Sequence, residues 1–108
     1  MDIEDIVFTR DLTFEEMCSI VRRVAEKYDI EHIYLFGSRA RGDHSSDSDY
    51  DFCVSFGQTK DPLQMCNLIC ELESALNKGV DVVGEHVLRP EVLKEVLTDG
   101  KLVYGTRS

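Results

Sequence analysis

The chain has 108 residues, which gives room for one domain of ordinary size and none for a second. Hydrophobic residues make up 43% of it and charged residues 31%, a balance typical of a folded globular protein rather than a disordered segment. Twelve Lys and Arg against 21 Asp and Glu leave a formal net charge of -9. Because such a charge repels phosphate backbones, free nucleic acid is not expected as a direct partner.

Residues 1–28 contain the N-terminal segment, in which we find no targeting signal, followed by the first predicted helix. The start, Met1–Asp5, lacks the basic and apolar segments of a signal peptide, and no stretch approaches a membrane span, so we expect a cytoplasmic protein without a membrane partner. Thr13 and Glu16 form the pattern of a capping box, which predicts a helix that begins at Phe14. An apolar stripe continues this helix at steps of three and four residues: Phe14, Met17, Cys18, Val21, Val24, Ala25 and Tyr28.

The rest of the chain alternates short apolar runs with two further helices. Four runs predict strands: Ile33–Phe36, Phe52–Phe56, Val80–Val83 and Leu102–Tyr104. Asp61 and Pro62 open a second helix that we expect to end at Gly79, and a third helix is predicted from Pro90 to Thr98. This alternation predicts an α/β or α+β fold, in which residues 1–108 form a single domain with a small mixed sheet and helices packed on one side of it.

The four cysteines form no C-x-x-C pair and lie at no zinc-finger spacing from a histidine. We therefore expect reduced cysteines packed in the core. Cys66 and Cys70 are one helical turn apart in the second predicted helix, which favours burial of both.

The residues most informative about chemistry are two aspartates at the start of the second predicted strand. Asp49 and Asp51 are two residues apart, so on a strand their side chains project from the same face of the sheet. Two carboxylates so close are costly unless a positive charge neutralises them. Hard divalent cations such as Mg²⁺ do so, because they prefer oxygen ligands and commonly bind one or two carboxylates together with substrate phosphates.

A third acid, Asp81, interrupts the apolar run Val80–Val83. A lone carboxylate in a strand otherwise suited to burial needs a partner. If this strand lies beside the strand of Asp49 and Asp51, the three acids form a site able to hold one or two metal ions for phosphoryl or nucleotidyl transfer. The main alternative is that the aspartates are turn residues, which suits Asp43 but explains neither Asp81 nor two carboxylates on one strand face.

A candidate phosphate-binding segment precedes these acids. Gly37 and Ser38 follow the first predicted strand, where glycine lets the backbone approach a phosphate and the serine hydroxyl can donate a hydrogen bond to it. Arg39 and Arg41 add positive charge, and arginine pairs bidentately with phosphate oxygens, so either could clamp a triphosphate. The alternative for each arginine is a solvated surface position.

Other known motifs fail on spacing. An EF-hand loop counted from Asp47 would need glycine in place of Phe52 and glutamate in place of Gln58. A phosphate loop of the Walker type would need a Gly-Lys-Ser/Thr ending, which is absent. Ser38 does not lie in a G-x-S-x-G sequence, so a hydrolase nucleophile is not indicated.

The combined pattern resembles a known family. Gly37–Ser38, ten further residues, Asp49-x-Asp51, and then Asp81 in a Val-Asp-Val-Val strand is similar to the polymerase-beta-type nucleotidyltransferases. More narrowly, it resembles the minimal nucleotidyltransferase (MNT) antitoxins that are paired with HEPN-domain RNase toxins. The similarity extends over the leading helix, Leu35–Gly42, the Asp-x-Asp strand and the closing segment Asp99–Tyr104.

This resemblance implies a polymerase-beta-like fold and the Mg²⁺-dependent transfer of AMP from ATP to a tyrosine hydroxyl of a HEPN toxin. It implies that Asp49 and Asp51 ligate one or two Mg²⁺ ions, that Asp81 ligates one ion and helps to deprotonate the attacking hydroxyl, and that Gly37 and Ser38 hold the triphosphate. Larger family members carry a second helical domain for the acceptor, whereas this sequence stops at Ser108. We therefore expect a partner protein to bring the acceptor, in a hetero-oligomer with the toxin.

Two other functions fit the same residues. The chain could neutralise a toxin by binding alone, with a folded but idle active site, or it could transfer a nucleotide to a small molecule such as an antibiotic. The three intact acids favour the enzyme over the binding module, and the missing acceptor domain argues against the small-molecule substrate.

Overall fold

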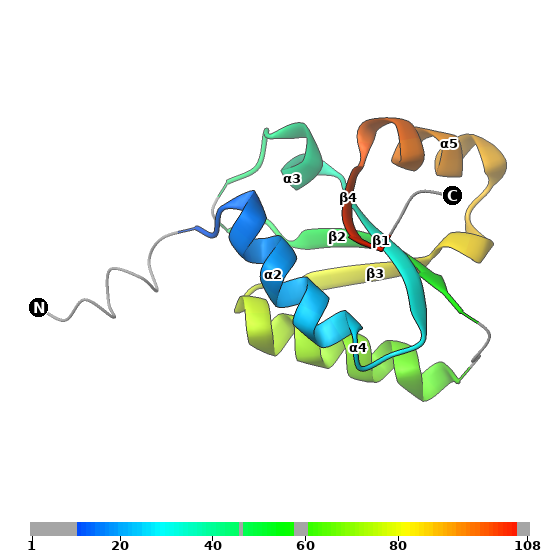
Figure 1. Ribbon diagram of the computed structural model, residues 1–108. Coiled ribbons are helices and arrows are strands. Elements are labelled where there is room, and N and C mark those ends of the chain that lie inside the picture. Colours follow the sequence, from blue (N-terminus) through cyan, green and yellow to red (C-terminus); the bar gives the residue numbers. More distant parts are fainter. Residues whose placement is uncertain (1–10, 46, 58–60, 106–108) are drawn as a thin grey trace, which may run out of the picture.

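The computed structural model describes residues 11–45, 47–57 and 61–105. In chain order the elements are α2 (Phe14–Ala25), β1 (Ile30–Phe36), α3 (Ser38–Arg41), β2 (Tyr50–Phe56), α4 (Pro62–Leu76), β3 (Val80–Gly84), the 3-10 turn η1 (Glu85–Val87), α5 (Pro90–Asp99) and β4 (Lys101–Gly105). Figure 1 shows how these elements are arranged. Among the described helices, none has the length and apolar content that crossing a membrane requires.

The four strands form one mixed sheet in the order β3-β2-β1-β4. β1 pairs antiparallel with both β2 and β4, while β2 and β3 are parallel. Parallel neighbours need a long crossover connection, and α4 supplies it between β2 and β3. The predicted α/β class with a small mixed sheet is therefore confirmed.

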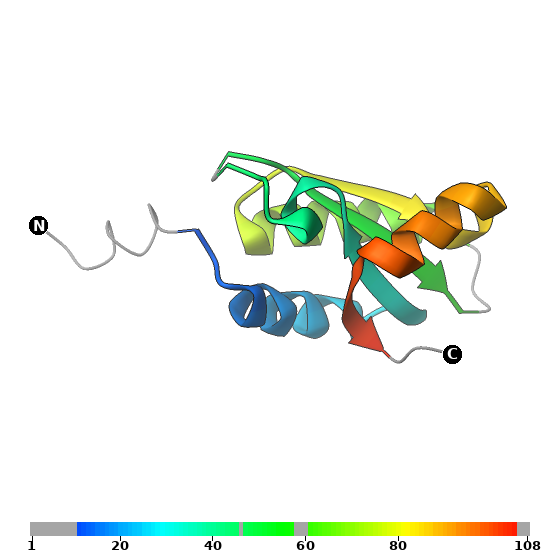
Figure 2. The ribbon, with the colours of Figure 1, turned by 90° about the horizontal axis from the view of Figure 1, so that it is seen from above.

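Helices lie on both faces of the sheet, although the sequence predicted them on one side. The main core lies between the sheet and α2 with α4, and it includes Val21, Leu72 and Phe52. A smaller cluster on the other face joins Tyr34 and Cys53 to Val96 of α5. In Figures 1 and 2, α5 accordingly lies across the sheet from α2. Because side chains alternate along β2, Asp51 projects from the same face as Cys53, away from α2 and α4.

The element boundaries follow local signals closely. Thr13 caps α2 through the predicted capping box, in which Glu16 reaches back to the Thr13 backbone. Asp61 caps α4 by accepting a hydrogen bond from the Leu63 backbone, and Gly100 follows the end of α5. The predicted end of α4 at Gly79 is wrong, because Asn77 takes the left-handed conformation after Leu76 and ends the helix there.

Candidate active site

The sheet brings two of the three predicted acids together. Asp51 lies on β2 and Asp81 on β3, and the parallel register pairs them directly. Asp49 precedes β2, and its carboxylate lies against Gly79, where a Cβ atom would come within 2.4 Å of Asp49 Oδ1. Hydrogen bonding from the Tyr50 amide to the Gly79 carbonyl, at 2.9 Å, fixes the two chain segments beside each other.

The three carboxylates differ in their surroundings. Asp51 is partly buried on an interior strand, whereas Asp49 and Asp81 are exposed. Burial raises the pKa of Asp51, and the negative charges of Asp81 and Asp49 and a hydrogen bond with the Asp81 side chain raise it further. The positive charge of Arg41 acts in the opposite direction. The site is therefore rich in oxygen atoms and negatively charged, and ionised Asp51 lacks a full counter-charge.

These properties suit a hard divalent cation. The donor atoms are all carboxylate oxygens, the ligands that Mg²⁺ prefers, and a cation would offset the cost of ionising Asp51 beside two other acids. In the described ranges, no three His, Cys, Asp or Glu side chains converge on one point suited to a metal ion as they stand. Binding of a cation would therefore require the side chains of Asp49, Asp51 and Asp81 to adjust their positions.

Gly37 places the candidate phosphate-binding turn directly beside Asp51. The register pairs Phe36 with Asp51 across β1 and β2, so the turn that follows β1 meets the start of β2. Gly37 has a φ of 76°, which favours glycine, and a Cβ atom on it would come within 2.4 Å of Asp51 Oδ2. Ser38 follows as the first residue of α3 and is partly exposed. The predicted Gly37–Ser38 turn therefore begins directly beside Asp51.

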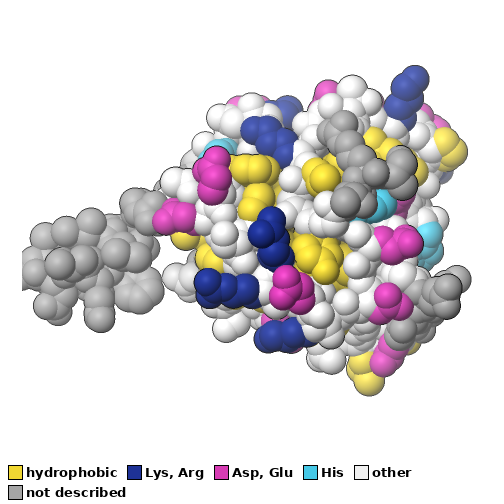
Figure 3. Space-filling view, in the orientation of Figure 1, with side chains coloured by type: hydrophobic (Ala, Val, Ile, Leu, Met, Phe, Trp, Pro, Cys, Tyr) yellow, Lys and Arg dark blue, Asp and Glu magenta, His cyan; other side chains and the backbone are white. Residues whose placement is uncertain are grey.

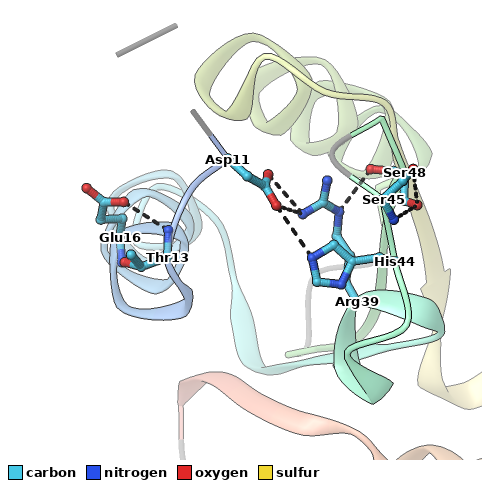
Figure 4. Close-up of polar contacts among 7 residues, drawn as sticks. All are labelled: Asp11, Thr13, Glu16, Arg39, His44, Ser45 and Ser48. Carbon is cyan, nitrogen blue, oxygen red and sulfur yellow. Dashed lines mark hydrogen bonds and ion pairs between the residues drawn. The ribbon is translucent and has the colours of Figure 1, made fainter. Parts of the chain in front are cut away.

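The two predicted arginines have different environments, and only Arg41 remains available for phosphate. Arg41 is exposed and its guanidinium pairs with Asp43 at 3.2 Å. Arg39 is buried, and it binds the Asp11 carboxylate and the Ser48 backbone carbonyl (Figure 4). The assignment of Arg39 to a triphosphate clamp is thus not supported, because its guanidinium is already engaged inside the protein.

The structure also corrects the positions expected for the cysteines. Cys53 is buried as predicted, and burial, followed by the charge of Glu85, raises the pKa of its thiol to about 11. Cys66 and Cys70 are exposed instead of buried. They face away because Leu68, Leu72 and Leu76 form the inner side of α4. All four cysteines are free thiols.

Two features at the other end of the sheet were not found by sequence reasoning. His32 is buried, and its Nε2 lies 2.6 Å from Glu85 Oε2, a pairing across residues far apart in the chain that no local pattern reveals. Nearby, a pocket of about 340 Å³ lies between the end of β2, at Ser55 and Phe56, and α5. Since the acids lie at the start of β2, this pocket is not part of the candidate active site.

Comparison with known proteins identifies a matching family and several similar sequences. The family model described as polymerase beta, nucleotidyltransferase, matches residues 19–108. The protein adenylyltransferase MntA of Shewanella oneidensis is 35% identical over 78 residues, a match that covers 72% of this chain but only 56% of that relative. The protein adenylyltransferase MntA of Thermococcus cleftensis is 34% identical over 92 residues, which cover 82% of this chain and 93% of the relative.

Solved structures support the same relationship. A toxin-antitoxin crystal structure with AMP-PNP matches with a TM-score of 0.69 and 30% identity, covering 89% of this chain and 76% of that one. A complex of the tri-AMPylated HEPN toxin of Shewanella oneidensis with its MNT antitoxin matches with a TM-score of 0.67 and 26% identity, covering 87% of this chain and 74% of that one.

Proposed function

Because this chain belongs to the polymerase beta nucleotidyltransferase family, we propose that it is a cytoplasmic protein adenylyltransferase that moves AMP from ATP to a HEPN-domain RNase toxin and so acts as an antitoxin. The observation that carries the proposal is the register that sets Asp51 beside Asp81, with Gly37 against Asp51. Two relatives that are named protein adenylyltransferases, and a solved complex of an MNT antitoxin with a HEPN toxin, support it.

We assign the cation site to Asp49, Asp51 and Asp81, which would hold one or two Mg²⁺ ions through their carboxylate oxygens. When bound, the ions would neutralise charge on the phosphates and act as Lewis acids. The protein's own residues would do the rest. Ser38 would donate its hydroxyl proton to a phosphate oxygen, and Gly37 leaves room for the triphosphate to approach the backbone. Arg41, exposed near Asp51, would add positive charge.

The transfer step is a displacement at the α-phosphorus of ATP. A hydroxyl oxygen of the toxin, which we assign to a tyrosine, forms a bond to this phosphorus, while the bond from it to the bridging oxygen breaks and pyrophosphate leaves with the electron pair. Asp81 is exposed at the edge strand, so its carboxylate can meet the acceptor and take the hydroxyl proton. The attached AMP would block RNA binding through its negative charge and its bulk.

The test is to incubate the toxin with this protein, ATP and Mg²⁺, separate the two proteins, and measure the toxin's mass and RNase activity. We expect a mass increase by one or more AMP units and RNase activity that stays low after separation. Asp49→Asn and Asp51→Asn should each lower the rate of AMP transfer on the order of a hundredfold or more. Asp99→Asn, at the exposed end of α5, is the matched control.

The same experiment separates the enzyme from a protein that acts by binding alone. Unchanged toxin mass together with full recovery of RNase activity after separation would overturn the transferase proposal. A toxin that is inhibited only while the two proteins remain mixed would then identify this chain as a binding antitoxin.

A further inference from the structure

Arg39 is a buried charge in a protein whose other charges are mostly exposed. Its side chain is only 3% exposed, and burying a guanidinium is costly unless hydrogen-bond acceptors surround it. The structure supplies them from Asp11, before α2, and from Ser48, in the loop before β2. Arg39 Nη1 donates to both carboxylate oxygens of Asp11 at 3.2 Å, and Arg39 Nε donates to the Ser48 carbonyl at 2.9 Å (Figure 4).

The position of these contacts relates Arg39 to the candidate active site. Ser48 directly precedes Asp49, and Tyr50 directly follows it. The Arg39 guanidinium also lies 4.1 Å from the centre of the Tyr50 ring, in a cation–π contact. A single side chain thus holds both chain neighbours of Asp49, one through its backbone and the other through its ring.

Asp11 completes this arrangement from the segment before α2. Its carboxylate binds Arg39 and also lies 3.4 Å from His44 Nε2, in the loop that leads toward Asp49. Within the same loop, the Ser45 amide donates to Ser48 Oγ at 3.0 Å and the Ser48 amide donates to the Ser45 carbonyl at 3.1 Å. The loop is therefore held by Asp11 and Arg39 on one side and by its own turn on the other.

We propose that Arg39 is a positioning residue for Asp49, held in place by Asp11, and that it does not bind phosphate. This inference rests on the proposed function, since it concerns the ligand set assigned there. The planar guanidinium presents its donors in a fixed geometry while it stacks on the Tyr50 ring, which a flexible ammonium cannot reproduce, so lysine is not an equivalent replacement. Residues that orient a metal ligand typically change metal affinity 10–100-fold when they are mutated.

The experiment measures Mn²⁺ binding to the free protein by calorimetry, and separately the kinetics of AMP transfer. We expect Arg39→Lys and Asp11→Asn each to weaken Mn²⁺ binding on the order of tenfold. They should lower kcat at a fixed Mn²⁺ concentration with little change in the KM for ATP, and added Mn²⁺ should restore part of the loss. Arg23→Lys, the same substitution at an exposed position of α2, should behave as wild type.

Asp11→Asn keeps the inference testable if Arg39→Lys does not fold, because Asp11 is partly exposed and its loss leaves the arginine in place. A folded variant with wild-type Mn²⁺ affinity, or one in which only the KM for ATP rises, would overturn the positioning role. If the wild-type protein itself binds no Mn²⁺, the proposed metal site fails and this inference fails with it. If wild type and variants bind Mn²⁺ as expected but no AMP is transferred, the proposed function alone fails.

Discussion

The carboxyl group of Asp51 is placed where its charge is unfavourable in the metal-free protein. It lies on an interior strand, and burial together with the charges of Asp81 and Asp49 raises its pKa. Asp81 faces it from the edge strand but is itself exposed to water. The folded protein therefore holds one carboxylate under electrostatic stress, which a bound cation would relieve.

We expect Asp51→Asn to raise the melting temperature of the protein in chelator at neutral pH, because the amide removes a charge that the fold disfavours. A gain of about 1 kcal/mol in the free energy of unfolding would correspond to roughly 4–8 °C in a domain of this size. Asp81→Asn should have a smaller effect, since Asp81 is exposed. A thermal melting scan that showed a clear drop for Asp51→Asn would mean that hydrogen bonds stabilise the ionised carboxylate.

Gly37 and Gly42 offer a matched pair that separates backbone strain from damage to the site. Both have a positive φ, 76° and 83°, so alanine is strained at each. Only at Gly37 would the new Cβ meet Asp51 Oδ2, at 2.4 Å, whereas nothing lies within 4 Å at Gly42.

We expect both alanine variants to lose about 1 kcal/mol or more of stability, and Gly37→Ala alone to lose most of its AMP transfer at a temperature where both remain folded. Melting curves and initial rates would be measured on the same preparations. Equal activity in the two variants would show that the contact between Gly37 and Asp51 is not needed for catalysis.

At the level of the elements, two residues that follow α4 have different roles, one in ending the helix and one beside Asp49. Asn77 adopts the left-handed conformation with a φ of 55° and ends the helix. Gly79 does not act as the cap but lies against the Asp49 carboxylate, where a Cβ would come within 2.4 Å of Oδ1. The glycine that resembles a helix stop therefore lies against a residue of the candidate active site.

We expect Asn77→Gly to raise the free energy of unfolding by a few tenths to about 1 kcal/mol, because glycine adopts this conformation more readily than asparagine. Gly79→Ala should leave stability nearly unchanged, since a carboxylate can rotate away, but it should lower AMP transfer by displacing Asp49. Denaturant unfolding and rate measurements on both variants test this division. A Gly79→Ala variant with full activity would contradict it.

The elements could be predicted because their signals are local. The capping box of Thr13, the Asp61–Pro62 start and the period of the strands are each contained in a few residues. From the sequence, Asp51 and Asp81 could be expected to lie close together only if their two strands were neighbours. The order of strands depends on contacts between distant residues, and only the structure shows that these two strands pair. The α4 crossover that joins the two strands is consistent with the parallel pairing found.

The residues whose environment differs from the expected one do so for an equally physical reason. Arg39 is held by Asp11, 28 residues earlier in the sequence, and the general preference of arginine for the surface gives no hint of such a partner. Cys66 and Cys70 share a helix face with each other, but a second set at the same spacing, Leu68, Leu72 and Leu76, competes for the core. The larger side chains of these leucines bury more apolar area, and they are the ones that face inward.

For the whole molecule, the net charge of -9 makes every added carboxylate costly. Figure 3 shows basic and acidic side chains interspersed on one face, so the excess of acids is partly offset there. Ordinary salt should stabilise such a protein by screening its self-repulsion, since the Debye length falls to about 10 Å at 0.1 M. A cation that binds a defined site should do more than this general screening.

We therefore expect MgCl₂ to raise the melting temperature further than NaCl at the same ionic strength, because binding to the folded state adds a stabilisation that grows with ligand concentration. The excess over NaCl should vanish in Asp81→Asn, which removes one proposed ligand, and persist in Asp99→Asn, which removes the same charge from the end of α5. Both variants change the net charge equally, so a difference between them cannot arise from screening. Identical curves for the two salts in the wild-type protein would mean that Mg²⁺ acts only as a counter-ion, and the assignment of Asp49, Asp51 and Asp81 as its ligands would have to be abandoned.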